Sequence, residues 1–270
     1  GRWLTRVLPG VRGGPYTGSM STETQGRASE GSSQTGARGV ALSTAAILLP
    51  LGMVVYVVST MAHPAREDPN SYAPVFTEYA ASDTWIAVHF AQYAAVLLLI
   101  GGLVALCLAM VHEGSSLAFL ARLGLVTAAA TVASFTLLFA VDGVALKRAV
   151  DAWVASAGTD RADATLAAAQ AIRWTEYGVN AFSFVLLGMT LTFVSVALIQ
   201  TRLLPRWAGW WGLVVGVALA VHGVMVGYVA FAPTAPGIVA LPGLLGWTLA
   251  TAFVIWRRPV QQPFSAPAAG

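Results

Sequence analysis

The chain has 270 residues, of which 57% are hydrophobic and only 10% are charged, whereas about a quarter of a typical soluble domain is charged. So little charge excludes a water-soluble globule and indicates that lipid is much of the solvent. The net charge of +3 comes from scattered residues, so no nucleic-acid partner is expected, and the single cysteine excludes an internal disulfide and a CxxC motif.

Residues 1–39 are rich in Gly, Ser, Thr and Arg and contain no long apolar run, which predicts a disordered N-terminal tail. They also lack the apolar core of a signal peptide. Met20 opens the stretch "MSTETQGRASEG", and our hypothesis is that it is the natural start, which the intact mass of the native protein tests. The polar residues 259–270 predict a second disordered tail.

Six apolar segments follow within residues 40–258, and together they predict one domain. Their bounds are 39–62, 84–111, about 117–141, 177–201, 207–230 and 238–256. The last two divide a run that is too long for one crossing at about 1.5 Å per residue, and "FAPTAPG" at 231–237 breaks it. Because backbone groups in hydrocarbon must be satisfied internally, the predicted fold is all-α, a six-helix transmembrane bundle.

Six crossings place both ends of the chain on one side of the membrane. If that side is the cytoplasm, ten of the 15 Lys and Arg residues are cytoplasmic, as the positive-inside rule requires. The expected location is a bacterial plasma membrane with both termini cytoplasmic. The long outer connections are 63–83 and 143–176. Within the second, residues 145–158 and 162–172 have helical spacing and are either short surface helices or an ordered loop.

This topology gathers polar residues from four helices in the outer third of the membrane. The candidates for a shared site are His89, Asp142, Glu176, Asn180 and His222, with Gln92 and Tyr93 one turn below His89. Two interpretations remain open. The residues form a shallow polar pocket that opens outward, or they only stabilise the bundle, for example through a hydrogen bond from His89 to Glu176 or Asp142.

Helical spacing groups further polar residues into two stripes. One stripe is Glu176, Asn180 and Ser183, and the other is Thr127, Thr131 and Ser134, with Asp142 further along the same face. Because exposure of polar groups to lipid is costly, both stripes are expected to face the interior of the bundle. A ridge of small residues on segment 207–230 predicts close approach of another helix, with His222 on a different face. The ridge is Gly212, Gly216, Ala220, Gly223 and Gly227.

Three classes of function are compatible with these residues. A haem- or metal-dependent enzyme would use His89 and His222 as ligands, with Asp142 or Glu176 completing a zinc site. No CxxCH, HExxH or GxSxG motif is present. A small-solute or proton-coupled transporter would use the same titrating groups. A non-enzymatic accessory, sensor or assembly protein, with lipids and a membrane-protein partner or a second copy around it, is the class we favour. The sequence assigns no cofactor, substrate or catalytic residue.

Three stretches carry a resemblance to known proteins. They are "HFAQYAAVLLLIGGLVAL" at 89–106, "EYGVNAFSFVLLGMTL" at 176–191 and "RLLPRWAGWWGLVVGV" at 202–217. Over roughly residues 40–258 the chain resembles uncharacterised bacterial multi-pass membrane proteins that are classed as domains of unknown function. The resemblance implies six helices and an inner-membrane location, and it brings no site residue with it.

Overall fold

The described part of the chain, residues 20–111 and 118–257 of a computed structural model, is helical and contains no strand. Its elements in chain order are α1 (Met20–Met61), α2 (Tyr72–Ala80), α3 (Trp85–Val111), α4 (Ala118–Ala140), the π-helical turn η1 (Val141–Leu146), α5 (Lys147–Ala155), α6 (Ala162–Thr201), α7 (Arg206–Val229) and α8 (Ala235–Trp256). The prediction of an all-α fold is therefore confirmed for these residues.

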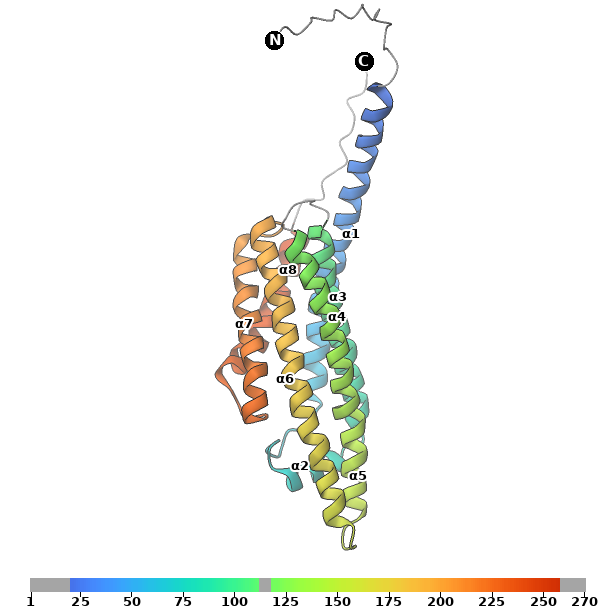
Figure 1. The fold of residues 1–270 in the computed structure, drawn as a ribbon, viewed down its shortest axis with the longest axis vertical. Helices are drawn as coiled ribbons and strands as arrows, with labels where there is room; N and C mark the ends of the chain where they lie inside the picture. The colour runs from blue at the N-terminus through green and yellow to red at the C-terminus, as the bar shows by residue number, and fades with distance from the viewer. Residues whose placement is uncertain (1–19, 112–117, 258–270) are drawn as a thin grey trace, which may run out of the picture. The chain divides into compact units, whose positions relative to one another are not determined.

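Six helical stretches in the described residues are long and apolar enough to cross a membrane. They are Gly36–Met61, Trp85–Val111, Phe119–Ala155, Ala162–Thr201, Arg206–Val229 and Ala235–Trp256. Number and order agree with the six predicted segments, so the protein is a multi-pass membrane protein. From Arg38 onward these helices form one compact unit in which they run side by side (Figure 1).

Helix α6 is the centre of this unit, because it packs extensively on both α7 and α4. The small-residue ridge of α7 makes the first of these contacts. A Cβ atom added to Gly223 would lie 2.6 Å from the backbone oxygen of Ala181, and one added to Gly216 would lie 2.9 Å from that of Gly188. The ridge thus permits backbone-to-backbone approach, as predicted, although Gly227 at its end is exposed.

The connection predicted over 143–176 is mostly helical, as the first of its two interpretations expects, but its helices are continuous with α4 and α6. The chain continues from α4 through η1 into α5, turns at 156–161, and enters α6 at Ala162. Helix α6 has 40 residues and is about 60 Å long, twice the hydrocarbon thickness of about 30 Å. Charged residues end the apolar segments at 141 and 177 but not the helices, because adding residues to an existing helix needs no new nucleus.

The N-terminal region also differs from the sequence prediction. Residues 20–39, for which the sequence predicts disorder, are helical as the first part of α1. Extension of a helix that already crosses the membrane satisfies their backbone groups at little cost. The remainder of the predicted N-terminal tail, residues 1–19, and the predicted C-terminal tail, residues 259–270, lie outside the described residues.

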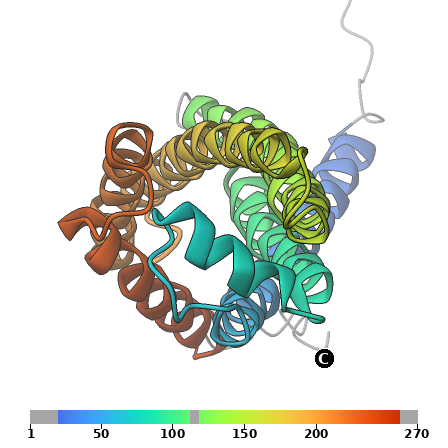
Figure 2. The ribbon, with the colours of Figure 1, turned by 90° about the horizontal axis from the view of Figure 1, so that it is seen from below.

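Helix α2, which the sequence analysis does not predict, covers one end of the unit. It lies across the ring of helices in the end-on view (Figure 2). Its apolar side packs into a small second core formed by Val75, Phe76, Tyr79, Trp85, Leu146, Val150 and Ala169. Lys147 donates to the backbone oxygen of Ala80 at 2.8 Å, which places a cation at the C-terminal end of α2. A packed helix therefore covers part of the bundle at this end.

Candidate functional site

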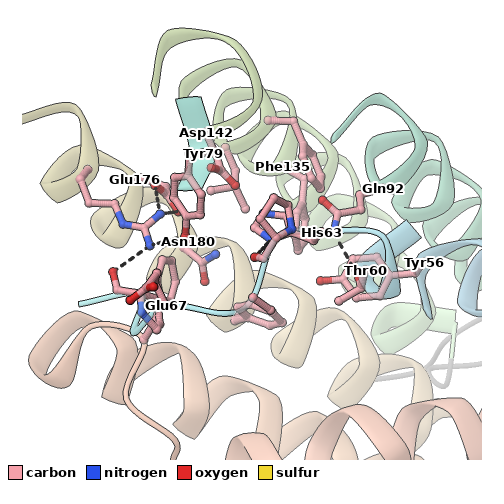
Figure 3. A pocket seen from close by; sticks show the side chains of 18 residues that line it. Tyr56, Thr60, His63, Glu67, Tyr79, Gln92, Phe135, Asp142, Glu176 and Asn180 are labelled. Atoms are coloured by element: carbon pink, nitrogen blue, oxygen red, sulfur yellow. Dashed lines mark hydrogen bonds and ion pairs between the residues drawn. The ribbon is translucent and has the colours of Figure 1, made fainter. Parts of the chain in front are cut away.

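A cavity of about 330 Å³ lies beneath α2, between α1, α3, α4, α6 and the segment that follows α1 (Figure 3). Its lining residues are Tyr56, Thr60, His63, Pro64, Ala65, Glu67, Pro69, Tyr79, Gln92, Phe135, Leu138, Phe139, Asp142, Arg173, Glu176, Asn180, Phe184 and Phe231. Its volume is at the small end of the range of about 300–1,000 Å³ that is usual for ligand sites. The wall is aromatic on several sides and polar at a few positions.

Three of the five candidate residues from the sequence line this cavity. Asp142, Glu176 and Asn180 come from η1 and α6. His89 is not part of the lining, but it hydrogen-bonds to Asp142. His222 is neither in the lining nor bonded to the other four. The structure therefore brings four of the five candidate residues together, and His222 lies apart from them.

The His89 ring is held at both nitrogens. Its Nδ1 lies 2.7 Å from the backbone oxygen of Trp85, and its Nε2 lies 3.0 Å from Oδ2 of Asp142. A carbonyl only accepts, so Nδ1 carries a hydrogen and donates it. The bond to Asp142 therefore contains one further proton, which belongs either to Nε2 in an ion pair or to the carboxyl in a neutral pair. The two side chains share one proton.

The π-helical turn η1 presents Asp142 to His89. A π turn contains an extra residue, leaves backbone groups without their usual helical partners and is frequent at functional sites. The indole Nε1 of Trp85 donates to the backbone oxygen of Asp142 at 3.1 Å. On the same turn, a Cβ atom added to Gly143 would lie 2.7 Å from Cβ of His89. A glycine is therefore required for the turn to approach α3 this closely.

His63, just after α1, completes an aromatic group around His89. Its ring centroid is 5.1 Å from that of His89 and 4.7 Å from that of Trp85. Its Nδ1 lies 2.7 Å from the backbone oxygen of Pro64, to which it donates. Burial lowers the pKa of His63 below the ordinary 6.5, and this hydrogen bond opposes the shift only in part. His63 is therefore neutral at pH 7, with a lone pair on Nε2.

Glu176 is paired with Arg173, one helical turn before it, and not with His89. Nη1 of Arg173 donates to both carboxylate oxygens at 3.0 and 2.8 Å, and each side chain is only 2% exposed. Nη2 of Arg173 donates to the backbone oxygen of Pro69 and to the Tyr79 hydroxyl. Burial raises the pKa of Tyr79 to about 12, so its phenol stays protonated. The charge of Glu176 is thereby neutralised inside the protein.

The segment that roofs the cavity is fixed by hydrogen bonds at both of its ends. Glu78 on α2 accepts from the backbone N–H groups of Arg66 and Glu67, each at 3.0 Å. Near α2, the Asn70 side-chain oxygen accepts from the backbone N–H of Phe231 at 3.2 Å. The roof therefore connects α2 to the α7–α8 connection.

Two buried acceptors in cavity-lining residues have no hydrogen-bond partner. They are Oδ1 of Asp142 and Oδ1 of Asn180, and the only other such side-chain atoms in the described residues are Oγ of Ser195 and Oγ1 of Thr251. An unpaired buried polar group costs about 1–3 kcal/mol, and native proteins contain few of them. Two in one cavity mark the place where a hydrogen-bond donor fits.

The polar stripes on α4 and α6 face each other below the cavity. The Ser134 and Ser183 hydroxyls are 2.7 Å apart, and those of Thr131 and Thr190 are 3.1 Å apart. Thr127 instead bonds back to its own helix. The prediction that the stripes face the interior is confirmed for these pairs, and their role is helix packing.

His222 has a local partner at the start of α8. Its Nδ1 lies 2.9 Å from Oγ1 of Thr234, which also accepts from the backbone N–H of Gly237 and so caps the helix. Neither ring nitrogen of His89 is free to bind a metal while its two hydrogen bonds persist. In the described residues, no group of three or more His, Cys, Asp or Glu side chains could hold a metal ion. The geometry therefore does not support haem or zinc between His89 and His222.

The sequence analysis misses three site residues, namely His63, Tyr79 and Arg173. Arg173 and Glu176 stand at positions i and i+3, a spacing that favours a salt bridge within a helix. The pair lies within 143–176, for which the sequence predicts a connection in place of a continuous helix. His63 and Tyr79 lie in a connection whose path has no periodic signal.

Comparisons with known proteins give one match. The family described as a domain of unknown function (DUF4386) matches residues 42–257, which include all six membrane spans except the first few residues of the first. No curated protein and no solved structure matches the chain. Since the match covers well over half of the 270 residues, the chain belongs to this family of unknown function, DUF4386.

Proposed function

We propose that this protein is a membrane sensor or accessory protein whose cavity binds a small solute from the outer side. The observation that carries the proposal is the cavity of about 330 Å³ with the unpaired buried acceptors of Asp142 and Asn180 in its wall. Its aromatic surfaces and few polar groups are typical of small-molecule sites. A protein that needed these residues only for bundle stability would gain by pairing them.

The proposed orientation places α2 and the α5–α6 turn outside a bacterial plasma membrane and both termini in the cytoplasm. Ten of the 15 Lys and Arg residues then lie on the cytoplasmic side, in agreement with the positive-inside rule. The cavity lies at the end that α2 covers. It therefore faces the outer solution, where a sensor meets solutes that are outside the cell.

A second candidate function is a proton-coupled carrier of small solutes. One observation favours it, namely the hydrogen bond between Nε2 of His89 and Oδ2 of Asp142 beside the cavity, from which a proton could be transferred. A carrier would move protons when a solute gradient is imposed on sealed vesicles, and a sensor would not. A pH-sensitive dye inside liposomes that contain the protein distinguishes these two candidates.

Thermal unfolding in lipid nanodiscs tests solute binding at the cavity. A panel of small amines, carboxylates, alcohols and sugars is added to the wild type and to Leu138→Trp, which fills the cavity from its wall. Bound solute at 100 times its Kd stabilises the folded state by about 2.7 kcal/mol. We expect at least one class to raise the Tm of the wild type but not that of Leu138→Trp.

A matched control uses the next residue of the same helix. Leu137 is 54% exposed and is not in the cavity lining, so Leu137→Trp should keep the full solute response. If no class in the panel changes the Tm of the wild type, or if Leu138→Trp responds equally, the cavity is not the binding site and the proposal fails.

A sensor must also pass its state to another molecule. The proposed recipients are a membrane-protein partner or a second copy of the chain within the lipid bilayer. Crosslinking in native membranes, with and without the solute that raises the Tm, shows which of the two changes on binding.

A further inference from the structure

The charges around the cavity leave one negative charge in its lining. Glu67, Asp142 and Glu176 bring three carboxylates to the lining, and Arg173 is the lining's one guanidinium. That guanidinium is committed to Glu176 by two hydrogen bonds, at 3.0 and 2.8 Å. The pair of Asp142 and His89 has no net charge, because the two side chains share one proton. Neutral His63 adds no positive charge to the lining at pH 7. The charge of Glu67 therefore remains, and the cavity favours a cation over an anion.

The carboxyl group of Asp142 is held so that one of its oxygens has a hydrogen-bond partner in the protein and the other has none. Its Oδ2 is bonded to His89 and its backbone oxygen accepts from Trp85, whereas Oδ1 has no partner. Hence His89 acts as a positioning residue for the carboxylate. The Asn180 side-chain oxygen in the same cavity is a second unpaired acceptor. An N–H group with more than one hydrogen can satisfy both acceptors.

The remaining wall suits an apolar body next to a positive charge. Aromatic rings in the lining are those of Tyr56, Tyr79, Phe135, Phe139, Phe184 and Phe231. Ring faces attract cations and bury flat apolar groups. The same region already holds one cation in this way, since the guanidinium carbon of Arg173 lies 4.7 Å from the centroid of Phe231. Labelled side chains in Figure 3 show Phe135 and Asp142 on the same side of this cavity.

From these observations we infer that the ligand of the cavity is an organic primary ammonium ion with an aromatic or other compact apolar body. Its N–H groups donate to Oδ1 of Asp142 and Oδ1 of Asn180, and its body packs on the aromatic wall. This inference rests on the proposed solute-binding function and names the class of solute. The ammonium group belongs either to a free amine or to the headgroup of an ethanolamine lipid.

Isothermal titration of three probes that share one apolar body and differ in their polar group tests which polar group the cavity prefers. Phenethylammonium, 2-phenylethanol and 3-phenylpropionate are titrated into the full chain in phosphatidylcholine nanodiscs, which contain no primary amine. We expect phenethylammonium to bind most tightly. Asp142→Asn, which can still donate to Nε2 of a neutral His89, should weaken it by about 10- to 100-fold, the range for a hydrogen bond to a charged group.

The control variant is Asp163→Asn, an identical change at an exposed position in the first turn of α6. It should leave the affinity for phenethylammonium unchanged. His89→Gln should weaken phenethylammonium but not 2-phenylethanol, because it frees the carboxylate to turn without removing its charge. If His89→Gln only disturbed the fold, it would weaken the binding of both probes equally, and this result would contradict the positioning role of His89.

A second pair of nanodiscs identifies the source of the ammonium group. If an ethanolamine lipid is the ligand, nanodiscs with phosphatidylethanolamine raise the Tm and compete with phenethylammonium, and Asp142→Asn removes both effects. If a free amine is the ligand, the lipid has neither effect. Equal or tighter binding of the alcohol or the carboxylate, or no effect of Asp142→Asn, would overturn the inference while leaving solute binding intact. No binding by any probe or panel class would remove the proposed function itself.

Discussion

At the scale of single residues, the site depends on which atoms of each side chain already have a hydrogen-bond partner within the protein. His89 uses both ring nitrogens, and Arg173 satisfies Glu176 completely. Of the hydrogen-bonded acids in the described part of the chain, only Asp142 keeps one buried oxygen unpaired. The chemistry of the cavity therefore centres on Asp142, although the sequence gives five polar residues equal standing.

His63 makes the stability of the protein depend on pH. Since its pKa is lowered in the folded protein, the unfolded chain binds a proton at a higher pH than the folded one. Stability is thus fully present above the ordinary pKa of about 6.5 and decreases as the pH falls below it. We expect the Tm in nanodiscs to fall between pH 7 and pH 5, and to fall less in His63→Asn.

If the Tm falls by the same amount at low pH in the wild type and in His63→Asn, His63 does not account for the acid-induced loss of stability.

At the scale of elements, hydropathy predicts where the chain enters the membrane but not where a helix ends. The apolar segment predicted at 177–201 is the C-terminal part of α6, which begins at Ala162. Residues 162–172 have the composition of a helix, and once joined to a spanning helix they need no separate nucleus. Helix α2 escapes prediction because its nine residues depend on the second core for their stability.

The π turn η1 is the element on which the site depends most. An alanine at 143 would place its Cβ 2.7 Å from Cβ of His89, so that α3 or η1 must move. Overpacking of this kind costs about 1–3 kcal/mol. Gly143→Ala is therefore expected to lower the Tm measured by thermal unfolding and to weaken binding of phenethylammonium.

Gly178→Ala on α6 is the matched control, because no atom lies within 4 Å of the added Cβ. It should maintain the Tm or raise it, since alanine is the better helix former. A Gly143→Ala variant as stable as Gly178→Ala would show that the close approach of η1 to α3 is not required.

At the scale of the whole molecule, topology alone brings Asp142, Glu176 and Asn180 to one end of the bundle. Six crossings determine which ends lie together, and this much is predictable from the sequence. The hydrogen-bond partners of these three residues are not predictable in this way. A helix that is apolar on all sides carries no strong sequence signal for which of its faces points into the bundle. The roof segment with Pro69 and Asn70 has no periodic pattern, so its bonds to the bundle appear only in the folded structure.

Labelling of a single cysteine at position 180 tests the central claim, which is that this cavity opens to the outer solution. In a Cys107→Ala background, Asn180→Cys is treated with a charged, membrane-impermeant thiol reagent in sealed vesicles of known orientation. Exposed Ala155→Cys, next to the α5–α6 turn, serves as the outer reference, and buried Ser195→Cys on α6 as the unreactive one. We predict labelling of position 180 from the outer side only, and labelling from the cytoplasmic side, or none while position 155 reacts, would contradict the account.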